Sequence, residues 1–136
     1  MTESVDTGRV ERFGSFERGR EVRSDVLGPD YVRAALGDGD PSPLQRLMTE
    51  TAWGGVWSRE ELPRRSRSMI TLAVLTALNR PHEVRVHTVG ALRNGLTPAE
   101  IREVVLHCAI YAGVPAAVDA TRVVEEVLAE QDGTPG

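Results

Sequence analysis

Apolar residues recur at helical spacing through most of this sequence, and no stretch alternates apolar and polar residues for long enough to make a strand. Aromatic side chains supply only 4% of the 136 residues, so a core has to be built from Leu, Val, Ile and Ala. Such a composition favours packed helices over a β-sandwich. We therefore predict an all-α fold, a compact helical domain of about six helices.

Glycine and proline divide the chain into the expected helices. Gly28-Pro29 is predicted to end a first helix, and Gly54-Gly55 is predicted to end a helix that begins at Pro43. Gly95 stands where the residue after a helix end belongs. The expected segments are a helix over 13–27, a short helical turn over 30–36, and helices over 43–53, 63–79, 81–94, 98–112 and 115–130.

The clearest local signal is Thr97-Pro98-Ala99-Glu100, which has the pattern of a capping box with proline in the first turn. In this motif the Thr97 hydroxyl accepts a hydrogen bond from the Glu100 amide, and the Glu100 carboxylate reaches back to the Thr97 amide. The sequence therefore predicts that a helix begins here.

Charge and composition exclude several classes of protein. The net charge of −4 argues against a nucleic-acid partner, which needs a basic surface. The longest apolar run, 69–78, is about half the roughly 20 residues of a membrane span. The single cysteine, Cys108, allows neither a disulfide nor a paired-cysteine redox site within one chain. We expect a cytoplasmic protein with a disordered tail over 1–10, one domain over 11–130 and a flexible tail over 131–136.

The segment 63–79 begins with Arg64-Arg65-Ser66-Arg67 and then becomes apolar on all sides. A helix that is apolar all round is buried on most sides, and one small domain offers little to cover it. We therefore expect a homo-oligomer. The basic cluster has two interpretations, a binding surface for substrate carboxylates or a solvated helix start.

Glu83 and His87 are four residues apart, so they share a face of the predicted helix. A carboxylate beside an imidazole fixes its tautomer and favours its charged form, which suits proton transfer near neutral pH. The same spacing also fits a surface ion pair or half of a metal site. His82 points about 100° away from Glu83 and is expected in solvent. Because His-Glu-x-x-x-His differs from the His-Glu-x-x-His pattern of zinc proteases, we expect no metal.

Four further residues have two interpretations each. His107 and Cys108 lie in an apolar segment, where we expect a buried, hydrogen-bonded imidazole and an inert thiol. Trp53 and Trp57 are four residues apart if the helix continues through Gly54-Gly55, and they fit either a core or interface or the wall of a pocket.

Several segments together resemble the 4-carboxymuconolactone decarboxylase family, within the alkyl hydroperoxidase D-like superfamily. The resemblance covers residues 16–130, and its most specific parts are Trp-Gly-x-x-Trp and Tyr-x-Gly-Val-Pro-Ala-Ala. The segments that carry it are Ala52-Trp53-Gly54-Gly55-Val56-Trp57, residues 62–73, Ala77-Leu78-Asn79-Arg80 followed by Glu83 and His87, Asn94-Gly95-Leu96-Thr97 with Glu100-Ile101, and Ala109-Ile110-Tyr111-Ala112-Gly113-Val114-Pro115-Ala116-Ala117.

This resemblance implies an all-helical, alkyl hydroperoxidase D-like fold and a homo-oligomer, a hexamer or a trimer. The implied reaction is cofactor-free decarboxylation of 4-carboxymuconolactone, a lactone dicarboxylate, to the β-ketoadipate enol-lactone and CO₂ in protocatechuate catabolism. His87 would then be the proton donor or oxyanion partner, with Glu83 orienting it or relaying the proton. Arg65 or Arg67 would anchor a substrate carboxylate, and Trp53 and Trp57 would wall the pocket.

Three alternatives remain open at this point. Peroxidases of the same superfamily carry Cys-x-x-Cys before the histidine, but Arg80 and Glu83 occupy those places in this sequence and Cys108 lies in another segment. A decarboxylase-like protein could act on another lactone. A binding protein without activity would keep the fold and lose the pocket.

Overall fold

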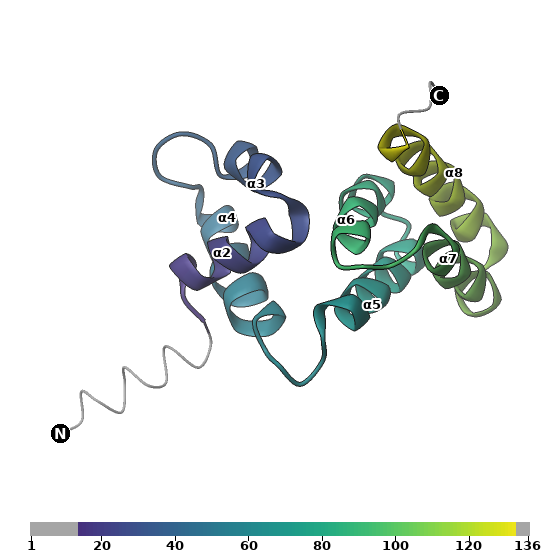
Figure 1. Ribbon diagram of the computed structural model, residues 1–136, viewed down its shortest axis with the longest axis horizontal. Helices are drawn as coiled ribbons and strands as arrows, with labels where there is room; N and C mark the ends of the chain where they lie inside the picture. Colours follow the sequence, from purple (N-terminus) through teal and green to yellow (C-terminus); the bar gives the residue numbers. More distant parts are fainter. Residues whose placement is uncertain (1–13, 133–136) are drawn as a thin grey trace. The chain divides into compact units, whose positions relative to one another are not determined.

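The computed structural model describes residues 14–132, and this part of the chain is helical with no strand (Figure 1). The predicted all-α fold is therefore confirmed. The predicted tail over 1–10 and the last four residues of the tail over 131–136 lie outside the described residues. The elements are the α-helices α2 Phe16–Leu27, α3 Pro29–Leu36, α4 Pro43–Leu47, α5 Arg64–Ala77, α6 Pro81–Arg93, α7 Pro98–Ala112 and α8 Val114–Gln131, and the π-helix η1 Met48–Trp57.

The chain divides into two compact units, one ending at Leu62 and the other beginning at Pro63. In the first unit, α2 packs closely on η1 because two glycines bring the backbones together. A Cβ on Gly19 would lie 1.8 Å from the carbonyl oxygen of Thr49, and a Cβ on Gly54 would lie 2.5 Å from that of Ser15. Only glycine fits at either position.

The prediction that Gly54-Gly55 ends a helix is wrong, because η1 continues through both residues to Trp57. Glycine weakens a helix through its backbone freedom, but here Gly54 allows the close contact with α2, and packing outweighs that intrinsic preference. The sequence shows no separate signal for the π-helical geometry of this segment.

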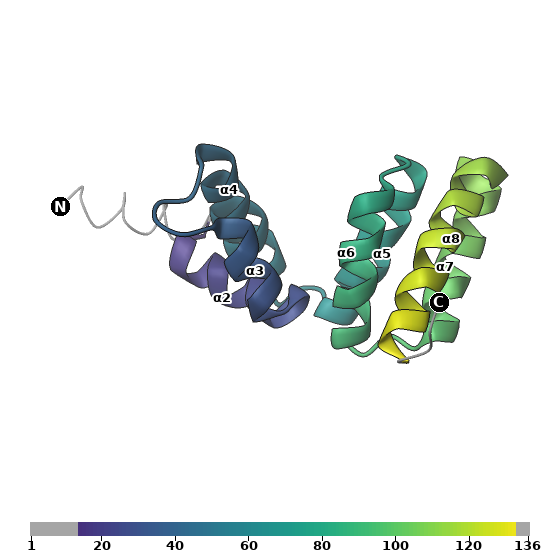
Figure 2. The ribbon, with the colours of Figure 1, turned by 90° about the horizontal axis from the view of Figure 1, so that it is seen from above.

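The second unit consists of α5, α6, α7 and α8, which lie side by side around one apolar core (Figure 2). Aliphatic side chains from all four helices and from the α6–α7 turn fill this core, as the composition requires. Its buried members are Leu72, Val84, Ala91, Leu96, Ile101, Val105, Ala117, Ala120, Val123, Val124 and Leu128.

The ends of these helices follow from particular residues. Asn79 has a positive φ of 57° directly after α5, where Arg80 N–H bonds to Leu75 O at 3.0 Å. Gly95 has a φ of 94° after α6, where Leu96 N–H bonds to Ala91 O at 3.0 Å. Both are Schellman ends, which satisfy carbonyls that the helix leaves unpaired. The position predicted for Gly95 is confirmed.

The capping box at Thr97 is also confirmed. The Glu100 amide donates to Thr97 Oγ1 at 3.1 Å, and the Thr97 amide donates to Glu100 Oε1 at 2.9 Å. No helix among the described residues is both long enough and apolar enough to cross a membrane.

Candidate active site

Helix α6 carries Glu83 and His87 beside its buried face. Val84, Thr88 and Ala91 are buried and hold the helix against the core of the second unit. Glu83 and His87 each lie one position before a buried residue, so their side chains lie at the edge of that face. His87 is half-buried with its Nδ1 atom fully buried, whereas the Glu83 side chain is 47% exposed.

His82 is the neighbour of Glu83 on the solvent side of α6. Its Nε2 atom lies 4.0 Å from Glu83 Oε1, and its side chain is 77% exposed, as predicted. Glu83 therefore stands between a solvent-exposed imidazole and the half-buried His87 one turn further along α6. This arrangement provides a carboxylate that can reach solvent beside an imidazole that is partly withdrawn from it.

Arg65, in the first turn of α5, forms an ion pair with Glu100 of α7. The pKa of Glu100 is lowered, first by its hydrogen bond from the Thr97 amide and then by Arg65. Arg65 therefore joins the start of α5 to the capping box of α7. Its guanidinium is already engaged by a carboxylate in this structure.

Arg67 has different surroundings, because it is half-buried and its Nε atom is fully buried. The next residue, Ser68, is completely buried, and its Oγ accepts a hydrogen bond of 2.8 Å from Asn94 Nδ2. This bond joins the end of α6 to the first turns of α5, so it fixes the α6 helix relative to Arg67. Sequence reasoning placed Ser68 and Asn94 only within segments of the family resemblance and missed the bond between them, because a contact between two helices leaves no spacing pattern.

Trp53 and Trp57 belong to the first unit, and the other candidate site residues belong to the second. The two indole rings are stacked with centroids 4.8 Å apart, and Trp53 and Trp57 are 5% and 8% exposed. Within their own unit the two indoles are core residues of η1. Their predicted role as a pocket wall stays a prediction.

On α7 the adjacent residues His107 and Cys108, both expected to be buried, differ in exposure. Cys108 is buried, its Sγ lies 3.7 Å from Ala73 O, and burial raises the pKa of its thiol. The predicted burial of His107 is wrong, because its side chain is exposed and its ring lies 5.1 Å from that of Tyr111. The buried face of α7 runs through Ile101, Val105 and Cys108, and position 107 lies outside it.

Within residues 14–132 no three His, Cys, Asp or Glu side chains come together as a group that could hold a metal ion. The donor set at the candidate site is a histidine and a carboxylate on one helix, with Arg67 on the neighbouring helix. These groups are suited to holding an anion and moving a proton.

The fold and the candidate site define a class of protein: all-helical, with a glutamate and a histidine one helical turn apart. Comparison with known proteins identifies the family. Residues 42–126 match the carboxymuconolactone decarboxylase family, and the chain belongs to this family.

Two curated relatives each match 83% of this chain. One is the nitrosuccinic acid decarboxylase of Metarhizium robertsii, 44% identical, of which 80% is covered. The other is the 4-carboxymuconolactone decarboxylase of Acinetobacter baylyi, 43% identical, of which 86% is covered. An uncharacterized 15.0 kDa protein of Paracoccus denitrificans is 32% identical over 62% of this chain and 65% of its own length.

Proposed function

We propose that this protein is a decarboxylase that converts 4-carboxymuconolactone to the β-ketoadipate enol-lactone and CO₂. The observation that carries the proposal is the 43% identity to a 4-carboxymuconolactone decarboxylase over 83% of this chain. The half-buried His87 beside Glu83 supports it, since the reaction needs a proton donor in a site partly withdrawn from water.

The substrate itself supplies the electron sink in this reaction. The bond between the γ-carbon and its carboxylate breaks, CO₂ leaves, and the electron pair passes through the ring C=C to the lactone carbonyl oxygen. The resulting dienolate takes a proton at the α-carbon. A protein therefore has to stabilise the developing oxyanion and deliver one proton, without a cofactor.

In this proposal His87 gives the proton or a hydrogen bond to the oxyanion, and Glu83 orients the imidazole or returns a proton from solvent. Arg65 or Arg67 binds a substrate carboxylate in this proposal, and binding by Arg65 would replace its ion pair with Glu100. A guanidinium binds a carboxylate through two parallel hydrogen bonds.

Nitrosuccinic acid is a second candidate substrate, because the Metarhizium robertsii relative is as similar to this chain as the lactone decarboxylase is. A nitro group also accepts the electron pair released with CO₂. Both reactions place negative charge on oxygen, so the same donor would serve either one.

The test follows CO₂ release from purified protein mixed with each compound separately. We expect turnover of 4-carboxymuconolactone, with His87→Ala and Glu83→Gln each lowering kcat by roughly 10²- to 10⁴-fold. His82→Ala is the matched control, since His82 lies on the same helix turn but in solvent, and it should keep normal turnover. Normal turnover in both site variants would exclude this catalytic pair, and turnover of nitrosuccinic acid alone would replace the proposed substrate.

We also propose that the protein acts in the cytoplasm as a homo-oligomer, a trimer or a hexamer. Exposed apolar side chains on α5, α7 and α8 support the assembly, among them Ile70, Ile110 and Val118. Light scattering of the purified protein measures the subunit number, and a monomer would contradict the proposal.

A further inference from the structure

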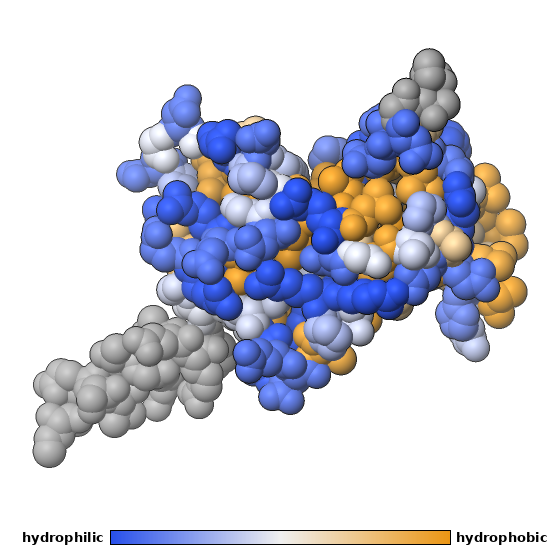
Figure 3. All heavy atoms as spheres, viewed as in Figure 1, coloured by the Kyte–Doolittle hydropathy of each residue, from blue (hydrophilic) through white to orange (hydrophobic). Residues whose placement is uncertain are grey.

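Large apolar side chains are exposed along three helices of the second unit. Ile110 and Tyr111 of α7 are 78% and 81% exposed, and Leu106 is 61% exposed. Figure 3 shows hydrophobic atoms gathered at the right-hand edge, where α7 passes into α8. The other members of this surface are Ile70 and Val74 of α5, Leu78 directly after it, and Val114 and Val118 of α8.

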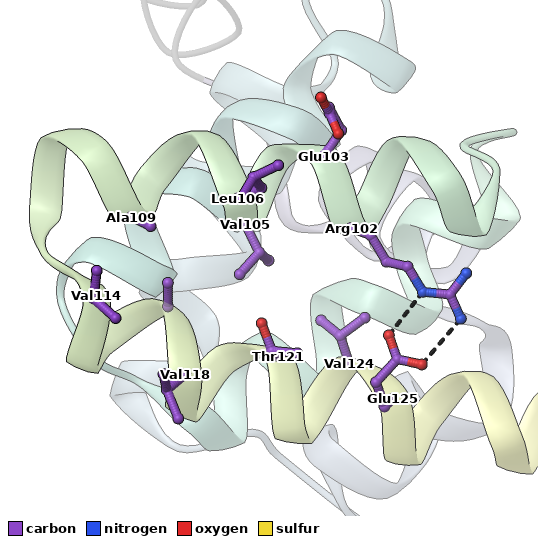
Figure 4. Close-up of a pocket in the computed structure, with 11 residues that line it drawn as sticks. Arg102, Glu103, Val105, Leu106, Ala109, Val114, Val118, Thr121, Val124 and Glu125 are labelled. Atoms are coloured by element: carbon purple, nitrogen blue, oxygen red, sulfur yellow. Dashed lines mark hydrogen bonds and ion pairs between the residues drawn. The ribbon is translucent and has the colours of Figure 1, made fainter.

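Helix α7 forms a ridge between two open grooves on this surface. The α5–α7 groove has a volume of about 450 Å³, and Met69, Ala73, Val104, His107 and Cys108 help to line it. The α7–α8 groove has about 420 Å³ and is lined by Val105, Leu106 and Ala109 from α7 and by Val118, Thr121 and Val124 from α8 (Figure 4). Ridges that fit grooves are how helices pack on one another.

The polar groups of the ridge are arranged to match a second copy of the same helix. Going along α7, Glu103 comes first, His107 follows four residues later and Tyr111 four residues after that. In a parallel pair of α7 helices related by a two-fold axis, each residue meets itself, so Glu103 would face Glu103. Like charges at close range are unfavourable.

In an antiparallel pair of α7 helices, the two-fold axis can pass through position 107. A residue a given number of positions before His107 then faces the residue the same number of positions after His107 in the partner subunit. Glu103 then faces Tyr111 of the partner subunit, and the phenol hydroxyl can donate to the carboxylate, twice by symmetry. The same register places Ile110 over Val104 of the partner subunit, which lines its α5–α7 groove. The exposed ridge of each copy thus enters a groove of the other.

We propose that α7 is the core of a two-fold interface, with antiparallel α7 helices crossing at His107 and with the Glu103 carboxylate bonded to the Tyr111 hydroxyl across it. This interface rests on the homo-oligomer proposed above and specifies which surface of the chain joins its subunits. A two-fold interface pairs the subunits, so the assembly then contains an even number of them.

The first test joins the two helices covalently at the proposed axis. In a Cys108→Ala background, His107→Cys should form a disulfide-linked dimer on oxidation, because the two positions face each other across the axis. Ile110→Cys in the same background is the matched control. Its two copies would be about 9 Å apart along the helices, which exceeds the roughly 7 Å between Cα atoms that a disulfide allows. Both positions are exposed, so the two variants differ from the shared Cys108→Ala background only at the surface.

We expect the cross-linked dimer for His107→Cys and none for Ile110→Cys. Equal cross-linking of both, or of neither in a protein that is oligomeric, would overturn this interface and leave the homo-oligomer standing. A monomeric native protein would overturn both. Decarboxylation is measured separately, so its loss or survival does not bear on the interface.

The second test breaks the interface with a charge. Ile110→Glu should halve the native mass in light scattering or reduce it further, with an unchanged helical circular dichroism spectrum. Leu44→Glu is the control, since Leu44 is 64% exposed on α4, outside this surface, and should leave the mass unchanged. An unchanged mass in Ile110→Glu, or an equal loss in the control, contradicts the proposal.

Discussion

At the scale of single residues, the buried thiol of Cys108 is expected to react slowly. Its thiol is 7% exposed, lies 3.7 Å from Ala73 O, and has a raised pKa because burial disfavours the thiolate. Since the thiolate is the nucleophile, a raised pKa means fewer reactive molecules at any pH below it.

We therefore expect Cys108 of the native protein to react with a thiol reagent at least ten-fold more slowly than free cysteine at pH 8. The rate should continue to increase above the pH at which free cysteine levels off. Unfolding in guanidinium chloride should restore the rate of free cysteine. A native rate equal to that of free cysteine would show that this thiol is neither buried nor shifted.

The residues of the candidate site differ in how far the sequence could place them. Glu83 and His87 were predictable on one helix face because a helix fixes the direction of residues four apart. The engagement of Arg65 by Glu100 was not, since it depends on how α5 and α7 pack. The exposure of His107 was also missed, because an apolar segment does not state which of its faces the core covers.

At the scale of elements, local signals predicted helix ends well. Gly95 and the Thr97 capping box act through bonds within a few residues, so their outcome depends little on the rest of the fold. Gly54 failed as a stop signal because its role is set by Gly19 of α2 and by Ser15 just before that helix, more than 30 residues earlier in the chain. Long-range packing is what the sequence pattern leaves open.

The close contact between α2 and η1 predicts a strong effect of a single methyl group. Gly54→Ala places a Cβ 2.5 Å from the carbonyl oxygen of Ser15, so the backbones have to move apart. We expect a loss of about 1–3 kcal/mol in unfolding free energy, as for other overpacked sites. Denaturant unfolding measures it, with Thr51→Ala, at an exposed position of the same helix, as the control that changes little. A Gly54→Ala variant as stable as the native protein would mean that the helices are not in contact there.

The capping box at the start of α7 should make the stability of the fold depend on pH. The folded-state pKa of Glu100 is lowered by the Thr97 amide and then by Arg65, so its contribution is present at pH values above the pKa of the unfolded chain. It is lost as pH falls through the lower, folded pKa. Glu100→Gln should therefore be less stable than the native protein at pH 7, and the difference should shrink in acid.

Thermal unfolding of the native protein and of Glu100→Gln between pH 7 and pH 3 measures this difference in stability. Thr97→Ala removes the other half of the capping box and should cost about 1 kcal/mol, with little dependence on pH. A stability difference for Glu100→Gln that stays constant down to pH 3 would mean that its carboxylate does not stabilise the fold.

At the scale of the whole molecule, the exposed apolar side chains of α5, α7 and α8 link folding to assembly. Ile110, for example, is 78% exposed in one chain but is covered in the proposed two-fold interface. An interaction that only the folded chain makes stabilises it by mass action, so stability should depend on protein concentration.

Each ten-fold increase in concentration adds about 1.4 kcal/mol per dimer formed. For a molecule of this size we expect Tm to rise by about 2–4 °C per ten-fold increase. Ile110→Glu should weaken this dependence, because the buried charge opens the two-fold interface before the chain unfolds, while Leu44→Glu should retain it in full. Calorimetry at three concentrations measures the slope. A native Tm that does not change with concentration would mean that folding of the second unit is complete within one chain, and that its apolar ridge stays open to solvent.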